Sequence, residues 1–115
     1  MSRRKRDNVA EAVEITTFEL RAGRDADGFV ALNADIDEWL RRQPGFQSRR
    51  ICALEDGSIV DVLVWDSAAQ GRDAAERIVA ETADSPVHAA IDQRTVVWRI
   101  AEVRQLTTAV KPRSR

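Results

Sequence analysis

Residues 58–70 read SIVDVLVWDSAAQ, and this stretch contains a strand, a stop and the start of a helix. Between Ile59 and Trp65 nearly every side chain is apolar and every second one is a β-branched valine, which is typical of a strand. Because both of its faces are largely apolar, both must be covered. Ser67 then offers a hydroxyl that can cap a helix, and Gln70 supplies the second half of a capping box.

Periodicity predicts the remaining elements around this stretch. Alternating apolar side chains predict three further strands, at residues 13–20, 46–54 and 95–103. After an N-cap at Asp25, apolar side chains recur every three to four residues and predict one amphipathic helix of about 17 residues, which ends before Pro44. A second helix follows Ser67, and a short helical segment follows Ser85. The apolar stripe of the second helix is expected at Ala75, Ile78, Val79 and Thr82.

The order of these elements predicts the fold class. Asp56-Gly57 indicates a tight type I′ turn, so residues 46–54 and 59–65 should pair as an antiparallel hairpin. Strand, helix and strand then occur twice, which is the split βαβ arrangement. We therefore predict an α+β, ferredoxin-like fold with a four-stranded antiparallel sheet and two helices on one face. The arginine-rich strand at 46–54 is expected at the edge.

The other face of this sheet would be apolar and uncovered. A monomer rarely exposes an apolar patch of several hundred square ångströms, so the sequence predicts a homodimer with the two sheets packed face to face. The residues expected on that surface are Val60, Val62, Val64, Val97 and Ala101.

Length and charge limit the classes of function. The chain has 115 residues and a net charge of −1, enough for one domain, which we place at 11–106 between basic tails at 1–10 and 107–115. Seven of the 18 basic residues lie in the tails, which leaves 11 basic against 18 acidic side chains in residues 9–110. An acidic body of net charge −7 argues against a nucleic-acid-binding surface. The tails are expected to be solvated, with contact to RNA or anionic lipid as the alternative.

Cys52 is the only cysteine, so an internal disulfide and a cysteine-based metal site are both excluded. Its place in a strand indicates a small buried side chain, with a reactive thiol as the alternative. No metal-ligand constellation, phosphate loop or dinucleotide motif is present, and we expect neither a metal nor a cofactor. With no apolar run long enough for a membrane span and no signal peptide, a cytoplasmic protein that does not bind membranes is predicted.

Five short motifs in order resemble the antibiotic biosynthesis monooxygenase-like family of dimeric α+β barrels. They are Glu38-Trp39-Leu40-Arg41, Pro44-Gly45-Phe46, Asp56-Gly57, Trp65-Asp66-Ser67 and Ser85-Pro86. The resemblance spans roughly residues 13–103. It implies the same fold, while relatives range from quinone-forming monooxygenases to haem-degrading oxygenases and proteins without known activity.

The resemblance also implies site residues. Members that oxidise anthrone-like polyketides without a cofactor use a tryptophan at the end of the third strand, an asparagine four residues earlier, a tyrosine in the next helix and a later arginine. This chain matches the tryptophan with Trp65, but has Asp61, Gly71 and, near the arginine position, His88. The haem-degrading branch needs a histidine where Asp92 stands, so haem degradation is disfavoured.

The residues themselves leave alternatives open. Asp61 is on the helix-facing side, where a carboxylate must be paired, hydrated or protonated; it is a catalytic base, or the ion-pair partner of Arg99 or Arg50. His88 is the second catalytic candidate because imidazole transfers protons at neutral pH, and otherwise a surface or capping residue.

Trp65 and Phe18 are the predicted substrate-binding residues, although Trp65 also fits a plain core position. Trp39 and Trp98 are expected in the core. Two functions follow: a cofactor-independent monooxygenase that binds an aromatic or polyketide-type molecule between sheet and helices, or a non-catalytic dimeric module of the same fold. An open cavity faced by Asp61 favours the first, and a filled interior with Asp61 in a salt bridge favours the second.

Overall fold

The structure is a computed structural model that describes residues 9–110. Its elements are β1 (Ala12–Leu20), α2 (Ala26–Ala31), α3 (Ala34–Arg41), β2 (Phe46–Ala53), β3 (Ile59–Trp65), α4 (Ala68–Glu81), α5 (Val87–Ala90) and β4 (Ile91–Glu102). Most of the two basic tails lies outside the described residues, and residues 103–110 contain no helix or strand. Within the described range, no helix is long and apolar enough to cross a membrane.

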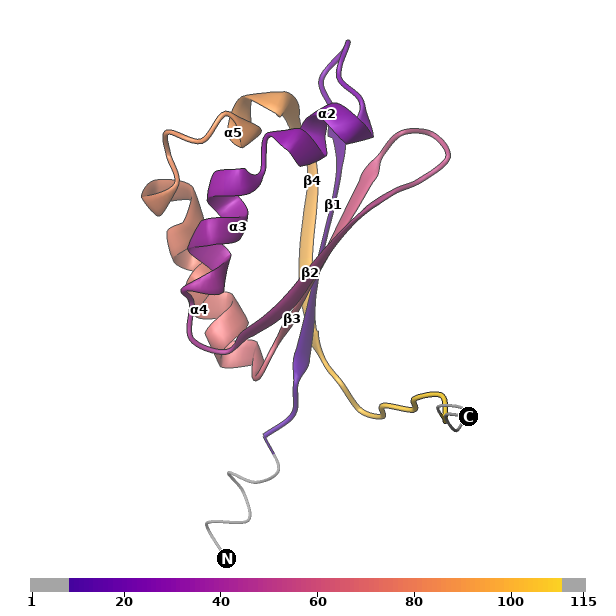
Figure 1. The fold of residues 1–115 in the computed structure, drawn as a ribbon, viewed down its shortest axis with the longest axis vertical. Helices are drawn as coiled ribbons and strands as arrows, with labels where there is room; N and C mark the ends of the chain where they lie inside the picture. Colours follow the sequence, from indigo (N-terminus) through magenta and orange to yellow (C-terminus); the bar gives the residue numbers. More distant parts are fainter. Residues whose placement is uncertain (1–8, 111–115) are drawn as a thin grey trace, which may run out of the picture.

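The four strands form one antiparallel sheet in the order β2-β3-β1-β4. The α3 and α4 helices lie on the same side of it (Figure 1). This is the ferredoxin-like arrangement expected from the order of the elements, so the predicted fold class is confirmed. The arginine-rich β2 is at the edge, as predicted.

The single helix expected after Asp25 is wrong, because the chain forms two helices there. Asp25 caps α2 as predicted, with its Oδ1 accepting from Gly28 N at 2.8 Å. At the end of α2, the amides of Leu32 and Asn33 bond to carbonyls three residues back, which tightens the last turn. The Asn33 side-chain amide also donates to the Phe29 carbonyl at 2.8 Å. The apolar period continues through this break, so periodicity did not reveal it.

The hairpin between β2 and β3 is confirmed, but its type I′ turn is wrong. A type I′ turn needs a positive φ at both central residues, but of Asp56 and Gly57 only Gly57 has one, of 89°. The Leu54 amide donates to the Ser58 carbonyl, and the Gly57 amide to the Leu54 carbonyl, which encloses a three-residue loop. Asp56 instead uses its side chain, which accepts from the Ser58 amide at 2.8 Å.

Strand β4 begins four residues earlier than expected. Its start is hidden in the sequence by the polar run Asp92-Gln93-Arg94. The ladder between β1 and β4 is irregular between Thr17 and Glu19, where the Glu19 amide donates to Thr95 Oγ1 at 2.8 Å. This irregularity allows the polar segment to remain in the sheet.

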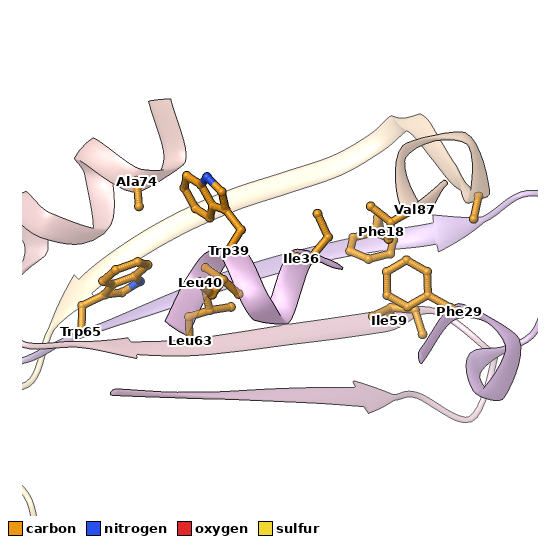
Figure 2. Packing of buried hydrophobic residues seen from close by; sticks show 11 residues of the cluster. Phe18, Phe29, Ile36, Trp39, Leu40, Ile59, Leu63, Trp65, Ala74 and Val87 are labelled. Carbon is orange, nitrogen blue, oxygen red and sulfur yellow. The ribbon is translucent and has the colours of Figure 1, made fainter. Parts of the chain in front are cut away.

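The core lies between the inner face of the sheet and the helices, while the outer face has no helix over it. Figure 2 shows the core side chains along β3, from Trp65 at one end to Ile59, beside Phe18 and Phe29, at the other. The outer face contains the expected apolar residues, of which Val97 is 45% exposed. Cys52 is on the outer face too and is exposed in this chain, so its expected burial is wrong for the protomer alone.

Helix α4 approaches the sheet closely because its buried positions are small: Ala68, Gly71 and Ala74. A Cβ atom at Gly71 would lie 2.6 Å from Ile100 Cδ1 and 2.9 Å from Trp65 Cδ1. There is no room for a tyrosine where the resemblance would place one. Of the expected stripe, Thr82 is buried and Ile78 packs partly against the core, whereas Val79 is 65% exposed.

We predict that Gly71→Ala destabilises the protein by about 1–3 kcal/mol, because overpacking against a rigid indole outweighs the better helix propensity of alanine. Urea denaturation measures the change in the free energy of unfolding. Ala69→Gly, at an exposed position of the same helix, measures the effect of helix propensity alone and should lower the free energy of unfolding by about 1 kcal/mol. A Gly71→Ala protein more stable than the wild type would contradict the close packing of α4.

Candidate functional site

A cavity of about 240 Å³ lies between the inner face of the sheet and the helices. Its walls are mainly apolar side chains from β1, β3, β4 and all four helices, among them Phe18, Phe29, Ile36 and Leu40. The polar side chains that line it include Glu14, Asn33, Arg49, Asp61 and His88. Apolar walls with a few polar groups are typical of small-molecule sites.

Asp61 lines this cavity and is held there by Arg49. Arg49 Nε donates to Asp61 Oδ1 at 3.0 Å and Nη2 to Asp61 Oδ2 at 2.7 Å, which is a bidentate ion pair. The third guanidinium nitrogen donates to Asp37 Oδ1 at 2.8 Å. Arg49 thus ties the edge strand β2 both to β3 and to helix α3.

The arginines expected as partners of Asp61 are not its partners. Arg50 lies opposite Val62, and Arg99 lies opposite Ile15, so both arginines are on the outer face of the sheet. The register irregularity near the start of β2 decides which of its arginines faces inward. The sequence gives no sign of that irregularity.

Arg49 keeps its charge inside the protein. Burial alone would lower its pKa, but the hydrogen bonds and negative charges of Asp61 and Asp37 outweigh burial, so the pKa of Arg49 is raised. Both oxygens of Asp61 therefore face a permanent cation. A carboxylate held in this way is a strong electrostatic anchor.

We predict that Asp61→Asn lowers the free energy of unfolding by about 3 kcal/mol, because it leaves the buried guanidinium without its main counter-charge. Asp37→Asn removes the other partner of Arg49, whose side chain is 38% exposed against 11% for Asp61. Its cost should be about 1 kcal/mol or less, since water replaces an exposed partner. Urea denaturation of both variants tests the difference, and equal losses would contradict the assignment of Asp61 as the main partner.

Glu14 is a second inward carboxylate, and sequence reasoning missed it. It is 7% exposed, and each of its oxygens accepts a hydrogen bond from an indole. Trp65 Nε1 donates to Oε1 at 2.8 Å and Trp98 Nε1 to Oε2 at 2.6 Å. The signal was available, since Glu14 alternates with Thr16 and Phe18 on the helix-facing side of β1.

Trp98 is not the core residue that was expected. It lines the cavity and is 40% exposed, with its indole nitrogen turned to Glu14. Trp39, expected in the core, is buried there at 6% exposure. The difference arises because Trp98 is on β4, at the edge of the sheet, where no helix covers it fully.

Burial raises the pKa of Glu14 above its ordinary value of 4.5, although the hydrogen bonds from Trp98 and Trp65 act in the opposite direction. The negative charge of Asp61 adds to the increase, and Arg49 reduces it. Glu14 is thus a carboxylate whose affinity for a proton is strengthened, in a cavity with apolar walls. This property suits a general base.

We expect the contribution of Glu14 to the free energy of unfolding to fall as pH rises from about 4.5 toward the raised pKa of Glu14, because the native state binds its proton more tightly than the unfolded chain. Glu14→Gln removes this contribution. The stability of the wild type relative to Glu14→Gln should therefore be greatest at acid pH and smaller at neutral pH. Urea denaturation at several pH values measures it, and a difference that grows toward neutral pH would contradict a raised pKa.

His88 also lines the cavity, and its hydrogen bonds identify its tautomer. Nε2 lies 3.0 Å from Thr82 Oγ1 and 3.0 Å from the Thr82 carbonyl. The Thr82 hydroxyl donates its own proton to the Ile78 carbonyl at 2.6 Å, so both of these oxygens are acceptors for His88. Nε2 must then carry the proton, which leaves Nδ1 as the acceptor of the ring.

The two predicted substrate-binding residues are placed differently. Phe18 lines the cavity, with its ring edge-on to Phe29 at 5.3 Å between centroids. Trp65 lies at one end of the core (Figure 2), is fully buried against Phe46, and reaches the cavity through its hydrogen bond to Glu14. Asp61, His88 and Phe18 thus share one cavity. Among residues 9–110 no group of three or more His, Cys, Asp or Glu side chains is arranged to hold a metal ion.

Several solved structures share this fold with the chain. SnoaB, a cofactor-independent oxygenase from Streptomyces nogalater, is 21% identical with a TM-score of 0.63, over 85% of this chain and 97% of its own. The ActVA-Orf6 monooxygenase of Streptomyces coelicolor, in complex with nanaomycin D, is 22% identical with a TM-score of 0.68, over 88% and 94%. A putative antibiotic biosynthesis monooxygenase from Chloroflexus aurantiacus J-10-fl is 16% identical with a TM-score of 0.59, over 88% and 98%.

No protein-family model matches the chain, and no curated protein does. At these identities the similarity to the solved structures establishes the fold. It confirms, at the level of fold, the resemblance to antibiotic biosynthesis monooxygenases that the five short motifs indicated.

Proposed function

We propose that the cavity binds a small aromatic or polyketide-type molecule and that the protein oxygenates it without a cofactor. The observation that supports this most is Glu14, a buried carboxylate with a raised pKa at the wall of an apolar cavity. The volume of about 240 Å³ suits a compact ligand, since pockets for drug-sized molecules begin at about 300 Å³. The solved oxygenases with the same fold point to the same chemistry.

In this proposal the protein removes a proton from a phenolic or enolic substrate, and the resulting carbanion gives an electron to dioxygen. Dioxygen is the oxidant: one oxygen atom becomes the new carbonyl oxygen, and the other leaves as water with the two hydrogens of the oxidised methylene carbon. The protein needs only to bind, to accept the proton and to exclude bulk water. Side chains alone can perform each of these tasks.

The proposed roles follow from the hydrogen bonds. Glu14 accepts the proton, and Trp65 and Trp98 position its carboxylate. Asp61 fixes Arg49 at the cavity wall, where the guanidinium stabilises a substrate anion. His88 is the second proton acceptor through Nδ1, and Phe18 packs against the substrate ring.

A non-catalytic dimeric module remains the second candidate because Asp61 is closed into a salt bridge and Gly71 stands where a tyrosine would be needed. The open cavity and the raised pKa of Glu14 favour the enzyme. An open cavity was expected for the enzyme and an Asp61 salt bridge for the module, and both occur here. A measurement of activity is therefore needed to distinguish the two candidates.

A homodimer through the outer face of the sheet is part of the proposal. Two pairs of apolar side chains lie at the centre of that face, Val62 beside Ile15 and Val64 beside Val13. Arg50 and Arg99 flank the first pair on the two edge strands. Packing a second copy there would bury a surface that no helix covers in one protomer. We place this dimer in the cytoplasm, with neither nucleic acid nor membrane as a partner.

We predict that Val97→Lys converts the dimer into a monomer, because the new ammonium would be buried between the two sheets beside Arg99, a second cation on the same face of β4. Val30→Lys is the matched control, since Val30 is 49% exposed against 45% for Val97 but belongs to helix α2. Light scattering at micromolar concentration should give a dimeric mass for the wild type and the control. A monomeric wild type would refute the face-to-face dimer.

We predict oxygen uptake above the spontaneous rate when the protein meets anthrones or dihydroquinones in metal-free buffer. Glu14→Gln should lower the rate by about 100-fold or more, because Gln cannot accept the proton. Glu19→Gln, an exposed position on the same strand, is the matched control and should keep the rate. Loss in Asp61→Asn with no loss in Glu14→Gln would assign the proton to Asp61, and no uptake on any member of the panel would favour the module.

A further inference from the structure

The Asn33 side chain at the junction of α2 and α3 has one polar atom without a partner. The residue is 1% exposed, and its Nδ2 donates to the Phe29 carbonyl at 2.8 Å, which fixes the orientation of the amide. The other side-chain atom, Oδ1, is buried and accepts no hydrogen bond from residues 9–110. Asn33 lines the cavity. A buried acceptor without a donor destabilises a protein, so it marks a place where a donor is expected.

The position of Asn33 assigns it to one end of the cavity. Its amide holds the Phe29 carbonyl, and the Phe29 ring contacts Phe18 on β1. Glu14 precedes Phe18 by four residues on the same strand, a separation of about 13 Å at the usual rise per residue. Asn33 and Glu14 therefore lie toward opposite ends of the cavity.

We infer that the aromatic ligand carries a hydroxyl group at the end remote from Glu14 and donates its proton to Asn33 Oδ1. This inference rests on the proposal that the cavity binds an aromatic molecule, and it narrows the substrate to hydroxylated rings. An ether or carbonyl at the same place would leave two acceptors facing each other. Asn33 is then a specificity-determining residue, because it separates ligands that differ by a single donor.

Calorimetric titration with 2-naphthol and 2-methoxynaphthalene tests the inference, because the second probe keeps the ring and the oxygen but lacks the donor. The wild type should bind 2-naphthol about three- to tenfold more tightly, as expected for one hydrogen bond. In Asn33→Leu the ratio of the two affinities should fall by about the same three- to tenfold. Comparing the ratio in the two proteins cancels the difference in hydration between the probes. Gln93→Leu removes another amide at the cavity wall and should keep the preference.

A second measurement needs no variant. In the labelled wild type, the NMR resonance of the Asn33 side-chain carbonyl carbon should move further downfield with 2-naphthol than with 2-methoxynaphthalene, because a hydrogen bond to Oδ1 adds to the ring-current shift that both probes cause. Both probes binding equally to the wild type, or a preference that survives in Asn33→Leu, would overturn the role of Asn33 and leave the proposed cavity intact. If neither probe binds, the proposed ligand class fails and this inference fails with it.

Discussion

Two carboxylates, Asp61 and Glu14, point from the sheet into the interior, and their different hydrogen-bond partners determine the chemical properties of each. Asp61 is locked by the bidentate contact with Arg49, which also joins β2 to α3. Glu14 receives only two neutral indole donors. Arg49 pairs the charge of Asp61 inside the protein, whereas the neutral donors at Glu14 do not offset the cost of burying its anion, so the pKa of Glu14 is raised. The first pair therefore stabilises the fold, and the second leaves a reactive group beside the cavity.

The same packing explains the size of the cavity. Helix α4 lies close to the sheet because Gly71 has no side chain, so the interior near Trp65 is filled. Space remains further along β1, between Glu14 and the aromatic pair of Phe18 and Phe29. Asn33, at the break between α2 and α3, also lines that space. Close packing near Trp65 thus leaves one cavity, which is lined by both the Glu14 carboxylate and the Asn33 amide.

Much of the fold was predictable because it depends on local patterns. The valine-rich β3, its hairpin to β2 and the Ser67 cap were all found from alternation and turn chemistry. The site was less predictable, since it depends on long-range register. Which arginine faces Asp61 was decided by an irregularity in β2, and the role of Trp98 by the edge position of β4. Glu14 was detectable from the alternation of β1, which places it on the inner face beside Phe18.

The role of Glu14 is tested most directly by titrating its carboxyl carbon by NMR in the folded protein, with the resonance assigned by its loss in Glu14→Gln. We predict a midpoint above the ordinary value of 4.5, because burial destabilises the anion more than the hydrogen bonds from the two indoles stabilise it. A midpoint at or below 4.5 would mean that Glu14 is a stabilised anion and not a proton acceptor. The proposed chemistry would then lose its base.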